Sequence, residues 1–113
     1  MSGLSGIVSE LQHELATGDR SSLRYDICLP VLIVMDGHEL YGVTENLSSS
    51  GALFRLSSRL PVDVEMAFLI DVPAEIIGSA GTAAIHGQGR VTRSYEENGQ
   101  YYAAIVINEY RFQ

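Results

Sequence analysis

The chain has no lysine, one cysteine and no long hydrophobic run. All seven basic residues are arginine, against 14 acidic residues, and the formal net charge is −7. This charge argues against binding to DNA, RNA or anionic membranes in general, because binding to each of these polyanions depends on a positive field around the protein. A single cysteine, Cys28, excludes an intramolecular disulfide. Its apolar neighbours predict a buried structural thiol rather than a nucleophile.

Signals for membrane insertion and secretion are also missing. No apolar run approaches the roughly 20 residues that a membrane-spanning helix needs. The N-terminus has no basic segment followed by a hydrophobic stretch, so we expect no signal peptide and a cytoplasmic location. A length of 113 residues fits one domain with a core of its own.

The sequence offers little for catalysis. His13, His38 and His86 fall on different predicted elements and lack the spacing of metal ligands. No glycine-rich loop of the Walker type is present. We therefore expect a protein that is not an enzyme, with no catalytic residue, no metal site and no cofactor.

The first residues have helical periodicity. Apolar side chains recur at spacings of three and four over residues 3–17, which predicts one apolar stripe on a helix that ends near Gly18. The stripe consists of Leu4, Ile7, Val8, Leu11 and Leu15. We therefore assign residues 1–18 to a short N-terminal helix and residues 19–113 to a β-barrel domain that includes the connector with Arg20 and Arg24.

From residue 27 onward the pattern is that of β-strands. Asp36-Gly37 and Asn98-Gly99 are strong signals for two-residue hairpin turns. Short turns between strands favour a mainly β fold, a small six-stranded antiparallel barrel. The predicted strands are Ile27–Met35, His38–Thr44, Ala52–Leu56, Glu65–Val72, Ala84–Glu96 and Gln100–Ile107.

Two of these strands carry detailed expectations. In Glu65–Val72 the apolar residues alternate, so every second side chain should face the core. In Ala84–Glu96 we expect Ile85, Val91 and Tyr95 on one face, and a bulge or bend at the two glycines Gly87 and Gly89. The connection Pro73–Thr82 contains two isoleucines. Either they cover one end of the barrel or they contact a partner.

Two short motifs carry the functional hypothesis. Arg20-Ser-Ser-Leu-Arg24 lies in a turn-rich connector before the first strand, and Asn46-Leu-Ser-Ser-Ser-Gly51 follows after 21 intervening residues. The arginine fork donates paired hydrogen bonds to phosphate or to the O6 and N7 atoms of guanine. Asn46 offers an amide, Ser48 a hydroxyl, and Gly51 either a backbone with positive φ or room for a ligand.

The two motifs together resemble the signature of the PilZ domain, a bacterial receptor module for cyclic di-GMP. The resemblance extends over roughly Asp19–Ile107, including Leu29-Pro-Val31 and Gly89-Arg-Val-Thr-Arg93. It implies a six-stranded barrel that binds cyclic di-GMP as a ligand. By this resemblance the ligand contacts are Arg20, Arg24, Asn46, Ser48 and Gly51, with Arg93 either a sixth contact or a plain surface arginine.

Two departures from the family pattern concern charge. Many relatives have a basic residue directly before the first arginine of the motif, where this chain has Asp19. Asp19 either weakens phosphate binding or orients Arg20 through an ion pair. Many relatives also have aspartate at the position of Asn46, where asparagine is an accepted alternative.

The sequence is compatible with two functions. In the first, the protein is a cyclic di-GMP receptor that changes conformation on binding and signals through a protein partner. In the second, it is a PilZ-like interaction adaptor that does not bind the nucleotide. The sequence identifies neither the partner nor the oligomeric state, and a homodimer is one open alternative. The arginine pair favours the receptor.

Overall fold

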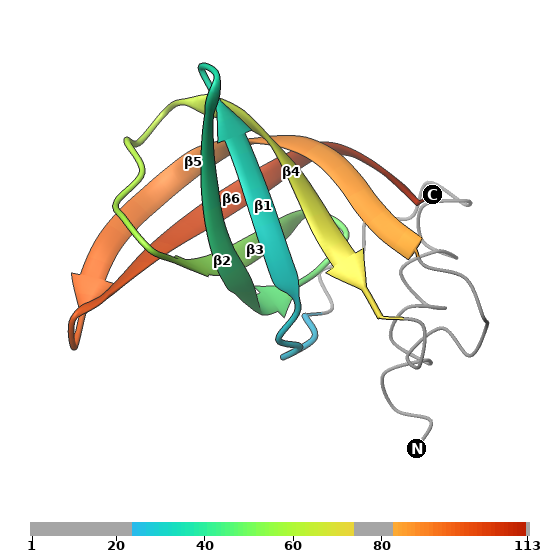
Figure 1. Cartoon of the computed structure of the whole chain (residues 1–113), viewed down its shortest axis with the longest axis horizontal. Helices are drawn as coiled ribbons and strands as arrows, with labels where there is room; N and C mark the ends of the chain where they lie inside the picture. The colour runs from blue at the N-terminus through green and yellow to red at the C-terminus, as the bar shows by residue number, and fades with distance from the viewer. Residues whose placement is uncertain (1–23, 74–82, 113) are drawn as a thin grey trace.

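The computed structural model describes residues 24–73 and 83–112, and these form a closed antiparallel β-barrel (Figure 1). The strand order around the barrel is β1-β2-β3-β6-β5-β4. The predicted six-stranded barrel is therefore confirmed. The strands are β1 (Pro30–Met35), β2 (His38–Leu47), β3 (Gly51–Leu56), β4 (Glu65–Val72), β5 (Ala83–Glu97) and β6 (Gln100–Phe112).

Several predictions concern residues outside these two described ranges. The predicted helix over 3–17, the first motif arginine Arg20, and the connection after Pro73 lie outside the residues that the structure describes. Within the described ranges, no residue is helical. Accordingly, no helix in this part of the chain is long and apolar enough to cross a membrane.

Both predicted hairpin turns are present. Asp36 and Gly37 join β1 to β2 with φ of 50° and 77°, and Asn98 and Gly99 join β5 to β6 with φ of 52° and 78°. Positive φ at both central residues is the type I′ geometry, whose twist matches that of the flanking strands. The second turn closes the longest ribbon of the barrel, since β5 has 15 residues and β6 has 13.

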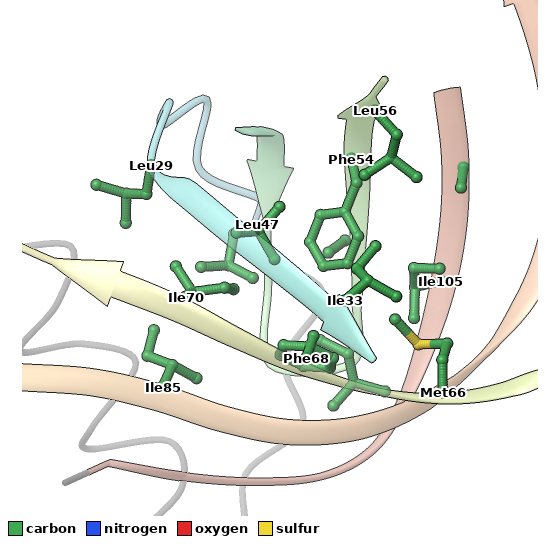
Figure 2. Close-up of a cluster of buried hydrophobic side chains, with 14 of the residues drawn as sticks. Leu29, Ile33, Leu47, Phe54, Leu56, Met66, Phe68, Ile70, Ile85 and Ile105 are labelled. Carbon is green, nitrogen blue, oxygen red and sulfur yellow. The ribbon is translucent and has the colours of Figure 1, made fainter. Parts of the chain in front are cut away.

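The barrel interior is filled by alternate side chains. On β4, Met66, Phe68, Ile70 and Val72 are all buried, as the alternation predicts. The rings of Phe54 and Phe68 meet edge to face, with centroids 5.7 Å apart. Figure 2 shows side chains from β1, β3, β4 and β6 converging on this space. Burial of this apolar surface is the main source of stability in such a barrel.

One buried polar residue joins the entering chain to the barrel. The hydroxyl of Thr44 on β2 accepts a hydrogen bond from the Leu29 amide at 2.9 Å and donates one to the Ile27 carbonyl. Further along, the backbones of Tyr25 and Leu47 exchange hydrogen bonds of 2.9 and 3.0 Å. These hydrogen bonds hold the segment before β1 along β2, and they thereby fix the position of Arg24 next to the end of β2.

Cys28 corrects one expectation from the sequence. Its neighbours Ile27 and Leu29 are both buried, whereas Cys28 is exposed. In extended chain, successive side chains point to opposite sides. Cys28 therefore points outward between two inward residues, and the apolar sequence context predicted the wrong side for it.

β-Bulges interrupt the alternation at three places. One extra residue stands on β2 at Glu45, one on β5 at Thr92, and one on β6 at Asn108. The β6 bulge lies opposite Gln88 and Gly89, where the glycines predicted an irregularity. A bulge shifts the following side chains to the opposite face of the sheet.

The bulge at Thr92 explains a second wrong expectation. Ile85 and Val91 are fully buried, but Tyr95 is only partly buried and pairs with Tyr102. Without the extra residue, Tyr95 would share the inward face of Val91. With it, Tyr95 lies on the outer face of the barrel.

Candidate ligand-binding site

The last residue of the first motif, Arg24, meets the first residue of the second motif, Asn46, near the end of β2. The Arg24 side chain donates a hydrogen bond from Nη1 to Oδ1 of Asn46 at 2.8 Å. The antiparallel Tyr25–Leu47 bridge explains this contact, because it brings the two chain segments side by side and so places the Arg24 side chain within reach of Asn46. The amide nitrogen of Asn46 takes no part in this bond and keeps its two donors for another group.

Asn46 begins a row of outward residues across four strands. The register places Asn46 opposite Leu53 on β3, Leu53 opposite Ala104 on β6, and Ala104 opposite Arg93 on β5. The row spans three inter-strand spacings of about 4.8 Å, or roughly 14 Å. Its two ends are polar and its middle is apolar.

Bulges set both ends of this row. Thr44 and Val91 point into the barrel, so Asn46 and Arg93, two residues further on, would point inward in regular strands. The extra residues Glu45 and Thr92 reverse this. Thr92 also donates a hydrogen bond from Oγ1 to the Ala104 carbonyl at 3.2 Å. Bulges commonly re-aim side chains beside functional sites.

A hollow of about 680 Å³ lies over this row. Arg24 and Asn46 line it on the β2 side and Arg93 on the β5 side. Between them the lining is small or apolar. The remaining lining residues are Ser50, Gly51, Ala52, Leu53, Thr92, Ala104, Ile105 and Val106.

Ser48 shapes the turn beside the hollow. It is 1% exposed, and its hydroxyl accepts hydrogen bonds from the amides of Ser50 and Gly51 at 3.3 and 3.1 Å. Its backbone carbonyl accepts a hydrogen bond from the Tyr110 hydroxyl at 2.5 Å. Ser48 does not line the hollow in this conformation, so its visible contribution is to hold the loop before β3.

Gly51 lines the hollow for a reason other than positive φ. Within the described residues, positive-φ glycines are Gly37 and Gly99, which corrects the first expectation for Gly51. A Cβ built on Gly51 would stand 3.0 Å from the Ile105 carbonyl oxygen. The absent side chain therefore permits a close approach of β3 to β6 and leaves the floor of the hollow open.

Positive charge gathers at this hollow in an otherwise acidic chain. Arg24 and Arg93 line it from opposite sides, and both are exposed. Arg90, one outward position from Arg93 on β5, has an ion pair with Asp63 at 3.4 Å. Two exposed guanidinium groups facing one apolar floor can bind an anion that also carries flat, apolar faces.

The structure brings together most of the predicted site residues. Arg24, Asn46, Gly51 and Arg93 line one hollow, Ser48 holds the adjacent turn through hydrogen bonds with the amides of Ser50 and Gly51, and Arg20 lies outside the described residues. Sequence reasoning missed the floor. Leu53, Ala104 and Val106 were not predicted as site residues, and only the register of β3 against β6 brings them to the same surface.

Metal binding finds no support in the described residues. No group of three or more His, Cys, Asp or Glu side chains there could hold a metal ion.

The described residues thus form a small closed six-stranded β-barrel with an arginine-rimmed hollow on its outer wall. The family model of the PilZ domain matches residues 18–113, and the chain belongs to this family. The search of curated proteins finds no match.

A solved structure agrees in fold. The chain is similar to the Bacillus subtilis inhibitor of motility, MotI/DgrA, with a TM-score of 0.66 and 18% sequence identity. The match covers 79% of this chain and 42% of that one. At this identity the likeness concerns the barrel alone, and the chain spans less than half of the longer protein.

Proposed function

We propose that the protein is a receptor for cyclic di-GMP and that the ligand occupies the hollow over β2, β3, β6 and β5. Membership of the PilZ family supports the ligand. The observation that carries the proposal is the 2.8 Å hydrogen bond from Arg24 to Asn46, because it joins the two motifs at one rim of the hollow.

The chemistry of the lining fits such a ligand. Cyclic di-GMP presents two phosphates and two guanines, which need cations, paired hydrogen bonds and flat apolar contact. Arg24 and Arg93 supply exposed guanidinium forks, and the free amide nitrogen of Asn46 supplies donors. Leu53 and Ala104 offer an apolar floor for a base.

Binding would act on the connector before β1. Arg24 is tethered through the Tyr25–Leu47 bridge, so this end of the connector starts in place. Arg20 lies four residues earlier in the sequence, and the two arginines would wrap the ligand with one arginine per site. Ordering of this segment would change the surface beside the hollow, and a protein partner would recognise the new surface in the cytoplasm.

Calorimetric titration with cyclic di-GMP tests the receptor assignment. Arg20→Ala and Arg24→Ala should each weaken binding by roughly ten- to a hundredfold, since charge-assisted hydrogen bonds contribute about 1.5–3 kcal/mol. Arg111→Ala is the matched control, because Arg111 is an exposed arginine that lines a different hollow. Cyclic di-AMP should bind weakly, since adenine lacks the O6 acceptor that an arginine fork reads in guanine.

Two outcomes would separate the parts of the proposal. No heat from the unmodified protein at high micromolar cyclic di-GMP would reject the receptor and favour the adaptor alternative. Amide exchange tests the closing connector. Tyr25 already donates to Leu47, so slower exchange on binding is expected over residues 19–24. Unchanged exchange there, with measurable affinity, would reject the closing movement alone.

A further inference from the structure

Arg93, which lines the hollow, is the end member of a row of stacked side chains on β5 and β6. Its guanidinium carbon lies over the Tyr95 ring, 4.6 Å from the centroid. Tyr95 in turn stacks on Tyr102, with centroids 5.1 Å apart and planes inclined by 15°. The three groups follow one another along the outer wall, and Arg93 is the member that lines the hollow.

The backbone explains why these three groups meet. Tyr95 and Tyr102 are register partners on neighbouring antiparallel strands, so their side chains stand side by side. Arg93 is two residues before Tyr95 and shares its outward face after the Thr92 bulge. The same bulge therefore places both the arginine and its aromatic support outside the barrel.

The stack restricts how Arg93 can move. An exposed arginine loses considerable rotamer freedom when it is immobilised by a ligand. Here one face of the guanidinium already lies on an aromatic ring, and that ring is braced by a second one. The N–H edge and the opposite face of Arg93 remain for a group in the hollow. Binding would then cost less ordering of this side chain.

We infer that Tyr95 and Tyr102 are positioning residues, which hold Arg93 ready for the ligand in the hollow without touching that ligand themselves. The inference rests on the proposed function of the same hollow. It assigns Arg93 a stacking or charge contact with the ligand, and it makes affinity depend on two tyrosines that carry no family motif.

A double-mutant cycle measures this dependence. Tyr95→Leu should weaken cyclic di-GMP binding by roughly two- to fivefold, the range of an exposed cation–π contact. Tyr95→Phe should keep the affinity, because the ring face and not the hydroxyl supports Arg93. In an Arg93→Ala background, Tyr95→Leu should cause no further loss. Tyr41→Leu is the control, since Tyr41 is a 64% exposed tyrosine on β2 that does not line the hollow.

Additive losses from Arg93→Ala and Tyr95→Leu would overturn the inference, and so would normal binding by Tyr95→Leu. Ligand-free NMR gives an independent check, since the Tyr95 ring should shift the Arg93 δ protons upfield in the unmodified protein and in Tyr95→Phe but not in Tyr95→Leu. An unshifted Arg93 in the unmodified protein would overturn the inference while leaving the receptor intact. No binding by the unmodified protein would overturn both.

Discussion

The inner and outer walls of the barrel are built from the same strands but follow different rules. Inside, regular alternation buries apolar residues such as Phe54 and Ile70, which are fully buried. Outside, the row from Asn46 to Arg93 exists because alternation fails at two bulges. Stability therefore depends on the regular part of each strand, whereas the candidate site depends on where regularity is broken.

The largest effect is expected from a substitution that leaves a cavity among the side chains inside the barrel. Phe54→Ala should lower the free energy of unfolding by about 3–5 kcal/mol, because Phe54 fills the centre of the barrel against Phe68. Denaturant unfolding followed by circular dichroism measures the loss. If the walls are separable, the affinity of the folded protein for cyclic di-GMP should stay unchanged.

The milder variant Phe54→Leu guards against failure to fold, and it should cost less than the alanine change. A large loss of affinity in well-folded Phe54→Leu would show that the inner packing controls the outer row. The division between the walls would then be wrong.

The inner wall is also the part that sequence predicts well. Alternation in β4 identified four buried residues. The dipeptides Asp36-Gly37 and Asn98-Gly99 each identified one of the two hairpins. These signals are local, because strand period and turn backbone depend on neighbouring residues. Cys28 and Tyr95 are two exceptions: an apolar neighbourhood does not say which side of an extended chain faces inward, and the bulge at Thr92 turns Tyr95 outward.

The outer wall was predictable only where a motif marks it. Arg24 and Asn46 were expected from the family signature, whereas Arg93 was left open as a ligand contact or a plain surface arginine; the structure adds that the three share a hollow. The sequence around Glu45 and Thr92 contains no signal that predicts a bulge at either residue. The floor residues Leu53 and Ala104 follow from pairing between distant strands. Such pairing is settled by the whole barrel and not by any short segment.

Two residues that flank the bulge at Glu45 have opposite roles. Thr44 lies before Glu45 and points inward, and Asn46 lies after it and points outward. Thr44→Val should reduce stability by about 1–3 kcal/mol, because it leaves the buried Leu29 amide without its acceptor. Affinity should remain. Asn46→Ala should do the reverse: roughly a two- to tenfold loss of cyclic di-GMP affinity, for a net hydrogen-bond contribution of about 0.5–1.5 kcal/mol.

Thermal unfolding and calorimetry on both variants provide the four values that this comparison needs. Loss of stability in Asn46→Ala as large as that in Thr44→Val would mean that the Arg24–Asn46 bond is part of the structural framework and not of a binding surface.

The smallest effect is expected where charge lies on the outer wall outside the hollow. Arg90 and Asp63 form an ion pair at 3.4 Å, with side chains 49% and 77% exposed. Exposed pairs of this kind contribute about 0–1 kcal/mol, so Arg90→Ala should change the free energy of unfolding by less than about 1 kcal/mol. Because Arg90 does not line the hollow, ligand affinity should fall only slightly, through the loss of one nearby positive charge.

Titrations at low and high salt distinguish this long-range effect from contact: the difference between Arg90→Ala and the unmodified protein should vanish at high salt, whereas that for Arg24→Ala should persist. A loss that persists for Arg90→Ala would extend the binding surface along β5 beyond the row that the two bulges define.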